Sequence, residues 1–300
     1  MKGKMDLFLD SGAFSAWQRG ETLQVEDYIK FIKEYDGCFG HYSVLDIIGD
    51  AEGTLRNQHI MEEAGLQPIP CYHYGEPTKY LEHYLANYDY IAIGGLAKNR
   101  TRDEIFNFLD HAFDVICDAR GIPVVRVHGF GLSSLRVLFR YPWYSVDSTS
   151  WLLGSRVGYI FVPRKLPNGE WDYMETLPGQ STRRIRVAAV CPGTPMPYMH
   201  IETLGKKWRS EVEEWLEQHG IQMGRTSFRP VLANYVPAEG EQKVRASRAR
   251  GQSYLQVAEV VGVSNSYAER DVLNAMYFKE LEEHFPPWPW AWKRPTMMRL

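Results

Sequence analysis

The first 150 residues repeat one alternating pattern, which limits the folds that the chain can adopt. Short apolar runs are each followed by an amphipathic segment with helical spacing. This is the pattern of a βα unit, and its repetition predicts a parallel sheet covered by helices. The candidate strands are residues 7–10, 41–46, 67–74, 90–95, 124–129 and 144–148.

Polar residues or glycines stand at the carboxyl end of nearly every candidate strand. Parallel strands bring these ends to one edge, where a TIM-type barrel keeps its chemistry. An open doubly wound sheet often carries a glycine-rich phosphate turn after its first strand, but the string here is DSGAFS rather than G-x-G-x-x-G. We therefore predict an α/β fold of the TIM-type (β/α)8 class, regular or irregular. The strand-end residues are Asp10, Asp46, His73, Gly94 with Gly95, His128 with Gly129, and Asp147.

After residue 150 the alternation loosens. Apolar runs near Ile160 and Val187 are candidates to complete the eight strands, and the sequence from Glu202 onward has helical spacing. We expect a barrel catalytic domain over residues 1–200 and a small, mainly helical region over 201–300 that binds nucleic acid or is accessory. Residues 254–273 fit either a helix-turn-helix or two short helices that pack on the barrel.

Composition and charge narrow the class of protein. The formal net charge of -3 argues against a protein that holds nucleic acid by charge alone. Basic clusters in the second half either form solvated faces or line a phosphate-binding groove. The candidates for phosphate contact are Arg183, Arg184, Arg186, Lys206, Lys207, Arg209, Arg245 and Arg248.

The cysteines and the N-terminus suggest a reduced compartment. The four cysteines are far apart, which indicates neither a disulfide framework nor a cysteine-built zinc site, and we expect no metal and no cofactor. No apolar stretch of about twenty residues is present, and the first residues become charged too quickly for a signal peptide. We expect a cytoplasmic protein without a membrane partner.

Five strings, taken in order, resemble the tRNA-guanine transglycosylase superfamily over about residues 7–165. They are LDSGAFS, VLDIIGD, CYHYGE, IAIGGLAKN, and VHGFG followed by SVDSTS. That family has an aspartate in a D-S-G-G-F-Q string, a base-reading aspartate, a Q-G-G string, a G-G-L-A string, a glycine pair and a nucleophilic aspartate. The counterparts here are Asp10, Asp46, His73 in place of the glutamine, residues 94–97, Gly129 with Gly131, and Asp147.

The resemblance fails at two places. The tRNA enzymes carry a zinc module of three cysteines and a histidine, whereas Cys191 and His200 stand alone here. The family also has two strands before its D-S-G string, whereas that string begins at residue 10 here.

Short, zinc-less chains of this type resemble the phage DNA 7-deazaguanine transglycosylases. That likeness implies exchange of guanine in double-stranded DNA for 7-cyano-7-deazaguanine or a derivative, in the infected host's cytoplasm, which protects the phage genome from restriction enzymes.

The same resemblance implies roles for single residues. Asp147 is the nucleophile that forms a covalent aspartyl-deoxyribose intermediate, and Asp10 handles the proton of the leaving base. Base exchange with retained configuration requires such a pair, with pKa values pushed apart. Asp46 can accept from both N–H groups of a guanine-like edge. The remaining base-binding candidates are His73, Gly94, Gly95, Leu96, Phe14, His128 and Gly129.

Each residue also has a plainer interpretation. A single strand-end aspartate is often a helix cap or an ion-pair partner. His128 either faces the pocket or braces the barrel, and Glu76 and Asp50 are most simply loop charges. Three competing functions remain: a divergent tRNA-guanine transglycosylase, a non-catalytic nucleic-acid-binding subunit, and a metal-dependent barrel hydrolase. The hydrolase lacks support because no H-x-H or H-E-x-x-H spacing is present.

Overall fold

A computed structural model describes residues 7–96, 100–174, 182–239, 241–246 and 252–293 of the 300-residue chain. The chain forms two compact units. The first holds the described residues up to Ser148 together with those from Pro286 onward, and the second spans Thr149–Phe285. The division therefore falls at Ser148, whereas we expected it near residue 200.

The first unit contains the expected parallel strands in chain order. β1 (Phe8–Leu9) pairs with β2 (His41–Tyr42), and a parallel bridge then joins Ser43 to Ile69. A four-stranded sheet comes next, in which each strand is parallel to the one before it. Its strands are β3 (Cys71–His73), β4 (Tyr90–Gly94), β5 (Arg126–Gly129) and β6 (Ser145–Val146). The predicted α/β class is confirmed.

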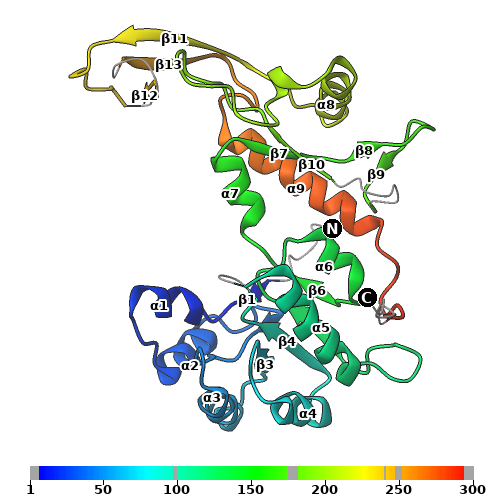
Figure 1. Cartoon of the computed structure of the whole chain (residues 1–300). Coiled ribbons are helices and arrows are strands. Elements are labelled where there is room, and N and C mark those ends of the chain that lie inside the picture. Colours follow the sequence, from blue (N-terminus) through cyan, green and yellow to red (C-terminus); the bar gives the residue numbers. More distant parts are fainter. Residues whose placement is uncertain (1–6, 97–99, 175–181, 240, 247–251, 294–300) are drawn as a thin grey trace. The chain divides into compact units, whose positions relative to one another are not determined.

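Helices connect these strands and lie around the outside of them (Figure 1). The Asp50 carboxylate caps the first turn of α3 by accepting from the Gly53 N–H at 2.8 Å, so it is more than the loop charge we expected. Helix α5 begins with a capping box between Thr101 and Glu104. The helices are α1 (Ala13–Arg19), α2 (Val25–Glu34), α3 (Ala51–Glu63), α4 (Thr78–Asn87), α5 (Arg102–Ile116) and α6 (Leu135–Arg140).

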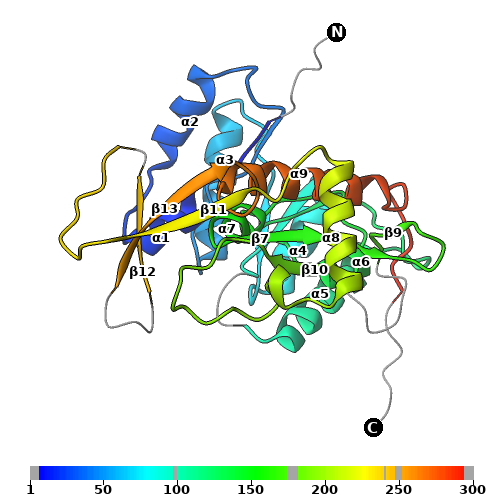
Figure 2. The ribbon, with the colours of Figure 1, turned by 90° about the horizontal axis from the view of Figure 1, so that it is seen from above.

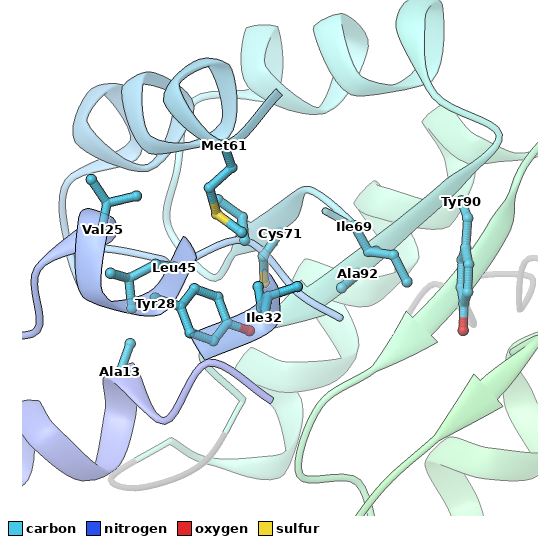
Figure 3. Close-up of a cluster of buried hydrophobic side chains, with 11 residues drawn as sticks. Ala13, Val25, Tyr28, Ile32, Leu45, Met61, Ile69, Cys71, Tyr90 and Ala92 are labelled. Atoms are coloured by element: carbon cyan, nitrogen blue, oxygen red, sulfur yellow. The ribbon is translucent and has the colours of Figure 1, made fainter. Parts of the chain in front are cut away.

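A buried cluster fixes the helices against the first strands (Figure 3). Tyr28 and Ile32 from α2 meet Met61 from α3 over the strand residues Cys71 and Ala92. Met61 and Ala92 are fully buried. Removing such apolar surface from water contributes about 25 cal/mol per Å², so this cluster holds the strand ends in place.

The end of the described chain returns to the first unit. Trp292 donates its backbone N–H to the Gly121 carbonyl at 2.8 Å. A Cβ on Gly121 would overlap the Trp292 carbonyl oxygen, and the glycine's φ of +80° is one that other residues rarely adopt. The Trp/Pro-rich C-terminal segment is thereby tied to the loop after α5.

The second unit begins with α7 (Ser150–Arg156) and is built around antiparallel pairs. β7 (Tyr159–Val162) pairs with β10 (Arg183–Arg186), and β8 (Arg164–Lys165) pairs with β9 (Trp171–Asp172). In a three-stranded sheet, β13 (Ser253–Val260) lies between β11 (Arg225–Val231) and β12 (Gln242–Arg245), and the long β11 and β13 run side by side (Figure 2). The helices are η1 (Ile201–Thr203), α8 (Lys206–Gln218) and α9 (Tyr267–Glu283).

Three expectations for this half are wrong. The runs near Ile160 and Val187 pair with each other instead of extending the parallel sheet. The region after residue 201 contains a sheet as well as helices, and residues 253–260 form a strand, so the helix-turn-helix is absent from the described residues 254–273. In β13, Ser253 and Leu255 are buried while their neighbours are partly exposed, which is the two-residue period of a strand.

Among the described residues, no helix is both long enough and apolar enough to cross a membrane.

Candidate active site

Three aspartates follow strands at the carboxyl edge of the first unit. Asp10 follows β1, Asp46 lies four residues after β2, and Asp147 follows β6. The charges of Asp46 and Asp147 both act on Asp10. The Phe8 ring on β1 also stacks on the His128 ring on β5, with centroids 4.4 Å apart. Side chains of the first and fifth strands therefore meet, although three strands lie between them in chain order.

Asp10 is the aspartate of this group whose pKa is raised. Asp10 is exposed as a residue, but the protein around its carboxyl removes part of the water there. This desolvation and the charges of Asp46 and Asp147 raise the pKa of the carboxyl. N–H donors from Gly12 and Ser11 offset only part of that rise. Asp10 is not the cap of α1, because that helix begins after Gly12 without a side-chain cap. A raised pKa suits a group that gives and takes a proton.

Asp147 shows the opposite shift. Desolvation opposes its charge, but the His128 imidazole and the Gly131 N–H lower the pKa of the carboxyl below its usual value. Gly131 donates to Asp147 Oδ1 at 2.7 Å, and His128 Nε2 lies 3.7 Å from the same oxygen. The side chain remains 49% exposed, so the ionised carboxylate is open to a ligand.

His128 is held rigidly beside Asp147. Its side chain is 3% exposed and lies between the rings of Phe8 and Phe130, at centroid distances of 4.4 and 4.6 Å. Nδ1 is 2.7 Å from Ser145 Oγ, which is in turn 2.6 Å from the Tyr90 hydroxyl. Of the two interpretations of His128, the one in which the ring faces the aspartate site fits these contacts.

A buried chain of charged groups lies under Asp46. Asp46 Oδ1 accepts from Ser11 Oγ at 2.9 Å, and Asp46 Oδ2 is 2.9 Å from His73 Nε2. The other ring nitrogen, His73 Nδ1, is 3.1 Å from Glu76 Oε1, and the His73 backbone N–H donates to Glu76 Oε2 at 2.9 Å. Both nitrogens of His73 therefore face carboxylates.

These contacts determine the protonation of the chain of charged groups. Burial disfavours a charge on His73, yet the adjacent Cys71 sulfur and the Asp46 and Glu76 carboxylates raise the pKa of the imidazole well above its usual value. Burial likewise opposes the charge on Asp46, but its bonds with His73 and Ser11 lower the pKa of that carboxyl. The arrangement is a cation between two anions, and Asp46 stays an acceptor.

Sequence patterns missed Glu76 and Ser11. Glu76 resembled a loop charge, but its side chain is only 7% exposed and binds His73. Its position three residues after a buried histidine, in a tight loop, was the available signal. Ser11 belongs to the DSG string, but its bond to Asp46 crosses 35 residues and cannot be read from local spacing.

Gly94 leaves room for His73. A Cβ on Gly94 would lie 2.9 Å from His73 Cδ2 and 3.2 Å from Cys71 Sγ. The glycine therefore permits the histidine's position, in addition to any approach by a base. Gly95 has a φ of +73°, which favours glycine, and a Cβ on Gly129 would overlap Leu132 Cδ1.

The other base-binding candidates vary in position. Leu96 is buried, whereas Phe14 on α1 is partly exposed and its ring lies 6.0 Å from that of Trp17. Ala97 lies outside the described residues.

The basic residues expected to touch nucleic acid divide by exposure. Arg184, Lys206, Lys207 and Arg245 are exposed, and Arg248 lies outside the described residues. Arg209 is bound to the Glu202 carboxylate and the Ile201 carbonyl, and the Arg186 guanidinium lies 4.6 Å from the centre of the Tyr159 ring. Arg183 needs a correction: it is buried and pairs with Glu211 at 2.5 Å, so it stabilises the second unit from inside.

Across the described residues, no group of three or more histidine, cysteine, aspartate or glutamate side chains is arranged to hold a metal ion. Comparison with known proteins finds no protein-family model and no curated protein that matches the chain. The transglycosylase resemblance therefore stays a prediction.

Proposed function

We propose that this protein is a base-exchanging transglycosylase that replaces guanine in double-stranded DNA with a 7-deazaguanine base. The observation that carries the proposal is the placement of Asp10 and Asp147 directly after two parallel strands of one unit, where the charge of Asp147 acts on Asp10. The surroundings lower the pKa of the Asp147 carboxyl and raise the pKa of the Asp10 carboxyl. One nucleophile and one proton donor are the two groups that exchange at a glycosidic carbon requires.

Asp147 and Asp10 can together perform each step of the base exchange. An Asp147 oxygen bonds to C1′ of the deoxyribose while the C1′–N9 bond breaks, and the electron pair leaves with guanine, which takes a proton from Asp10. The incoming base returns its N9 proton to Asp10 and attacks C1′. The bond between C1′ and the Asp147 oxygen breaks, and its electron pair returns to the carboxylate. Atoms and charges balance over the cycle.

The chain of charged groups under Asp46 supports recognition of guanine. His73 and Ser11 hold Asp46 ionised and in one orientation. A carboxylate has about four acceptor positions, so Asp46 can still accept from N1–H and the exocyclic amine of guanine. Adenine does not present that pair of donors, because its N1 is an acceptor. His73 acts through Asp46, since both of its nitrogens already face carboxylates.

The finer architecture belongs to the same proposal. Six parallel strands in chain order, curled so that β1 contacts β5, support an irregular relative of the TIM-type barrel. The exposed Arg184, Lys206, Lys207 and Arg245 of the second unit support phosphate contact. The target guanine would have to leave the base stack to reach the aspartates.

Labelled guanine distinguishes the substrates. The protein is incubated with radiolabelled guanine and either duplex DNA or bulk tRNA, and label in the washed polymer is counted. Label in DNA alone is the expected result. Label in tRNA alone would make the protein a tRNA-guanine transglycosylase. Label in neither polymer, with 7-cyano-7-deazaguanine also failing to displace guanine from labelled DNA, would contradict base exchange.

Formation of the covalent adduct between Asp147 and the deoxyribose is the first half-reaction, and its rate should have a bell-shaped pH profile. Asp147 must be ionised, and its pKa lies below the ordinary 3.8. Asp10 must be protonated, and its pKa lies above 3.8. Adduct formation should therefore fall at acid pH as Asp147 gains a proton, and fall again as pH rises through the pKa of Asp10. Single-turnover rates measured across pH test this, and an Asp10→Asn variant should lose the alkaline limb along with most of its rate.

A further inference from the structure

The nucleophile carboxylate has two unequal oxygens. Gly131 donates to Asp147 Oδ1, and His128 Nε2 faces that same oxygen. Because both contacts fall on Oδ1, Oδ2 is the oxygen placed to attack. In the covalent intermediate Oδ1 would be the carbonyl oxygen of an ester, with the Gly131 N–H and the His128 ring still beside it.

The proton on His128 has a preferred position. Nε2 is buried, and within the described part of the chain it has no hydrogen-bond partner. At 3.7 Å it is close to Asp147 Oδ1 but beyond hydrogen-bond distance. A proton on Nε2 points toward the carboxylate, whereas a bare Nε2 would turn a lone pair toward it. A buried polar group without a partner is costly, so the protonated Nε2 is the favoured form.

Two hydroxyl groups can hold that form in place. With Nε2 protonated, Nδ1 must accept, and Ser145 Oγ at 2.7 Å can donate to it. Ser145 Oγ is then free to accept from the Tyr90 hydroxyl at 2.6 Å. The rings of Phe8 and Phe130 keep the imidazole from turning over. The result is a directed chain from Tyr90 through Ser145 to His128 and on to Asp147.

We propose that His128 is a positioning residue that donates from Nε2–H to Asp147 Oδ1 and speeds the return of that carboxylate as the leaving group. This inference rests on the proposed base exchange and adds a role for the second half-reaction. When the bond between C1′ and Oδ2 breaks, its electron pair returns to Oδ2 and the negative charge spreads over the carboxylate onto Oδ1, which faces the Gly131 N–H and the His128 ring. Hydrogen bonds that strengthen as charge develops lower the barrier of that step. The apo distance of 3.7 Å need only shorten slightly as the site fills.

The first test does not depend on activity. Two-bond proton–nitrogen NMR spectra of protein with ¹⁵N-labelled histidine distinguish the two tautomers, and the His128→Gln variant assigns the His128 signals among the nine histidines. We expect protonated Nε2 and bare Nδ1 in the free protein near neutral pH, and a mixture in Ser145→Ala. A proton on Nδ1 instead, in the wild-type protein, would overturn the proposal.

The second test separates the two half-reactions. Formation of the DNA adduct, and its loss when 7-cyano-7-deazaguanine is added, are followed on denaturing gels. In His128→Leu the loss of adduct should slow by about tenfold or more, with a smaller effect on formation, so adduct accumulates. His128→Gln keeps an N–H donor at a similar reach and should recover much of the rate. The matched control is His59→Leu, at an exposed position on α3, which should behave as wild type.

The outcomes separate this inference from the proposed function. Equal slowing of both half-reactions, or none in a folded variant, would contradict the positioning role. If His128→Leu does not fold, Ser145→Ala leaves the ring in place and should show the same selective slowing to a smaller degree. If the wild-type protein forms no adduct with DNA or tRNA, the proposed function fails, and the tautomer measurement still decides whether His128 donates to Asp147.

Discussion

Replacing Asp147 with asparagine should reduce base exchange by about 10⁴-fold or more while leaving the fold intact, because the amide cannot form the ester with C1′. The side chain is half exposed and makes its hydrogen bond to the backbone N–H of Gly131, which an amide oxygen can also accept. We therefore expect little change in unfolding free energy. The covalent adduct, seen as a slow band on a denaturing gel, should be absent.

A matched control is available in the same unit. Asp118→Asn alters an aspartate in the loop between α5 and β5, where its carboxylate accepts from the backbone N–H groups of Arg120 and Ile122. It should keep wild-type exchange. Normal exchange by Asp147→Asn would contradict the nucleophile assignment, and adduct formation by that variant would require a different attacking residue.

Local pattern was sufficient to predict the elements that carry the candidate site. Residues 90–95 form a short apolar run that ends in glycine, and the buried strand β4 occupies it. Asp10, His128 and Asp147 were identified because parallel strands end at one edge, so a polar residue after each apolar run must lie near that edge. These predictions depend only on a short apolar run and on the type of residue at its carboxyl end.

The contacts that tune the site could not be predicted in that way. Ser145 and Tyr90 are 55 residues apart, and their bond depends on the register of three neighbouring strands. The strand at residues 253–260 was not predicted, for a different reason. Its leucine and valines are spaced by two and three residues, which fits both a strand and a helix, and the segment forms a strand because it pairs with β11 and β12. Arg183 looked like part of a basic surface cluster because sequence does not reveal that Glu211 approaches it from another element.

Removing the carboxylate of Glu76 should destabilise the first unit by about 3 kcal/mol. Glu76→Ala leaves His73 Nδ1–H and the His73 backbone N–H without their acceptor, in a place where both side chains are almost fully buried. Breaking one partner of a buried charged pair costs about 3–5 kcal/mol, and bonds to a charged group about 1.5–3 kcal/mol each. Urea unfolding followed by fluorescence measures the loss, and Glu82→Ala at an exposed position on α4 is the matched control.

The loss of unfolding free energy in Glu76→Ala should also depend on pH, in one direction. The pKa of folded His73 is raised above 6.5, so the stabilisation by its carboxylate partners is fully present below the unfolded pKa and disappears as pH rises through the folded value. The difference between wild type and Glu76→Ala should therefore be largest near pH 6 and shrink at more alkaline pH. A difference that grows with pH would mean that His73 is neutral in the folded protein. Asp46 would then lack the cation that holds it ionised for guanine, and its role in reading the base would lose its physical basis.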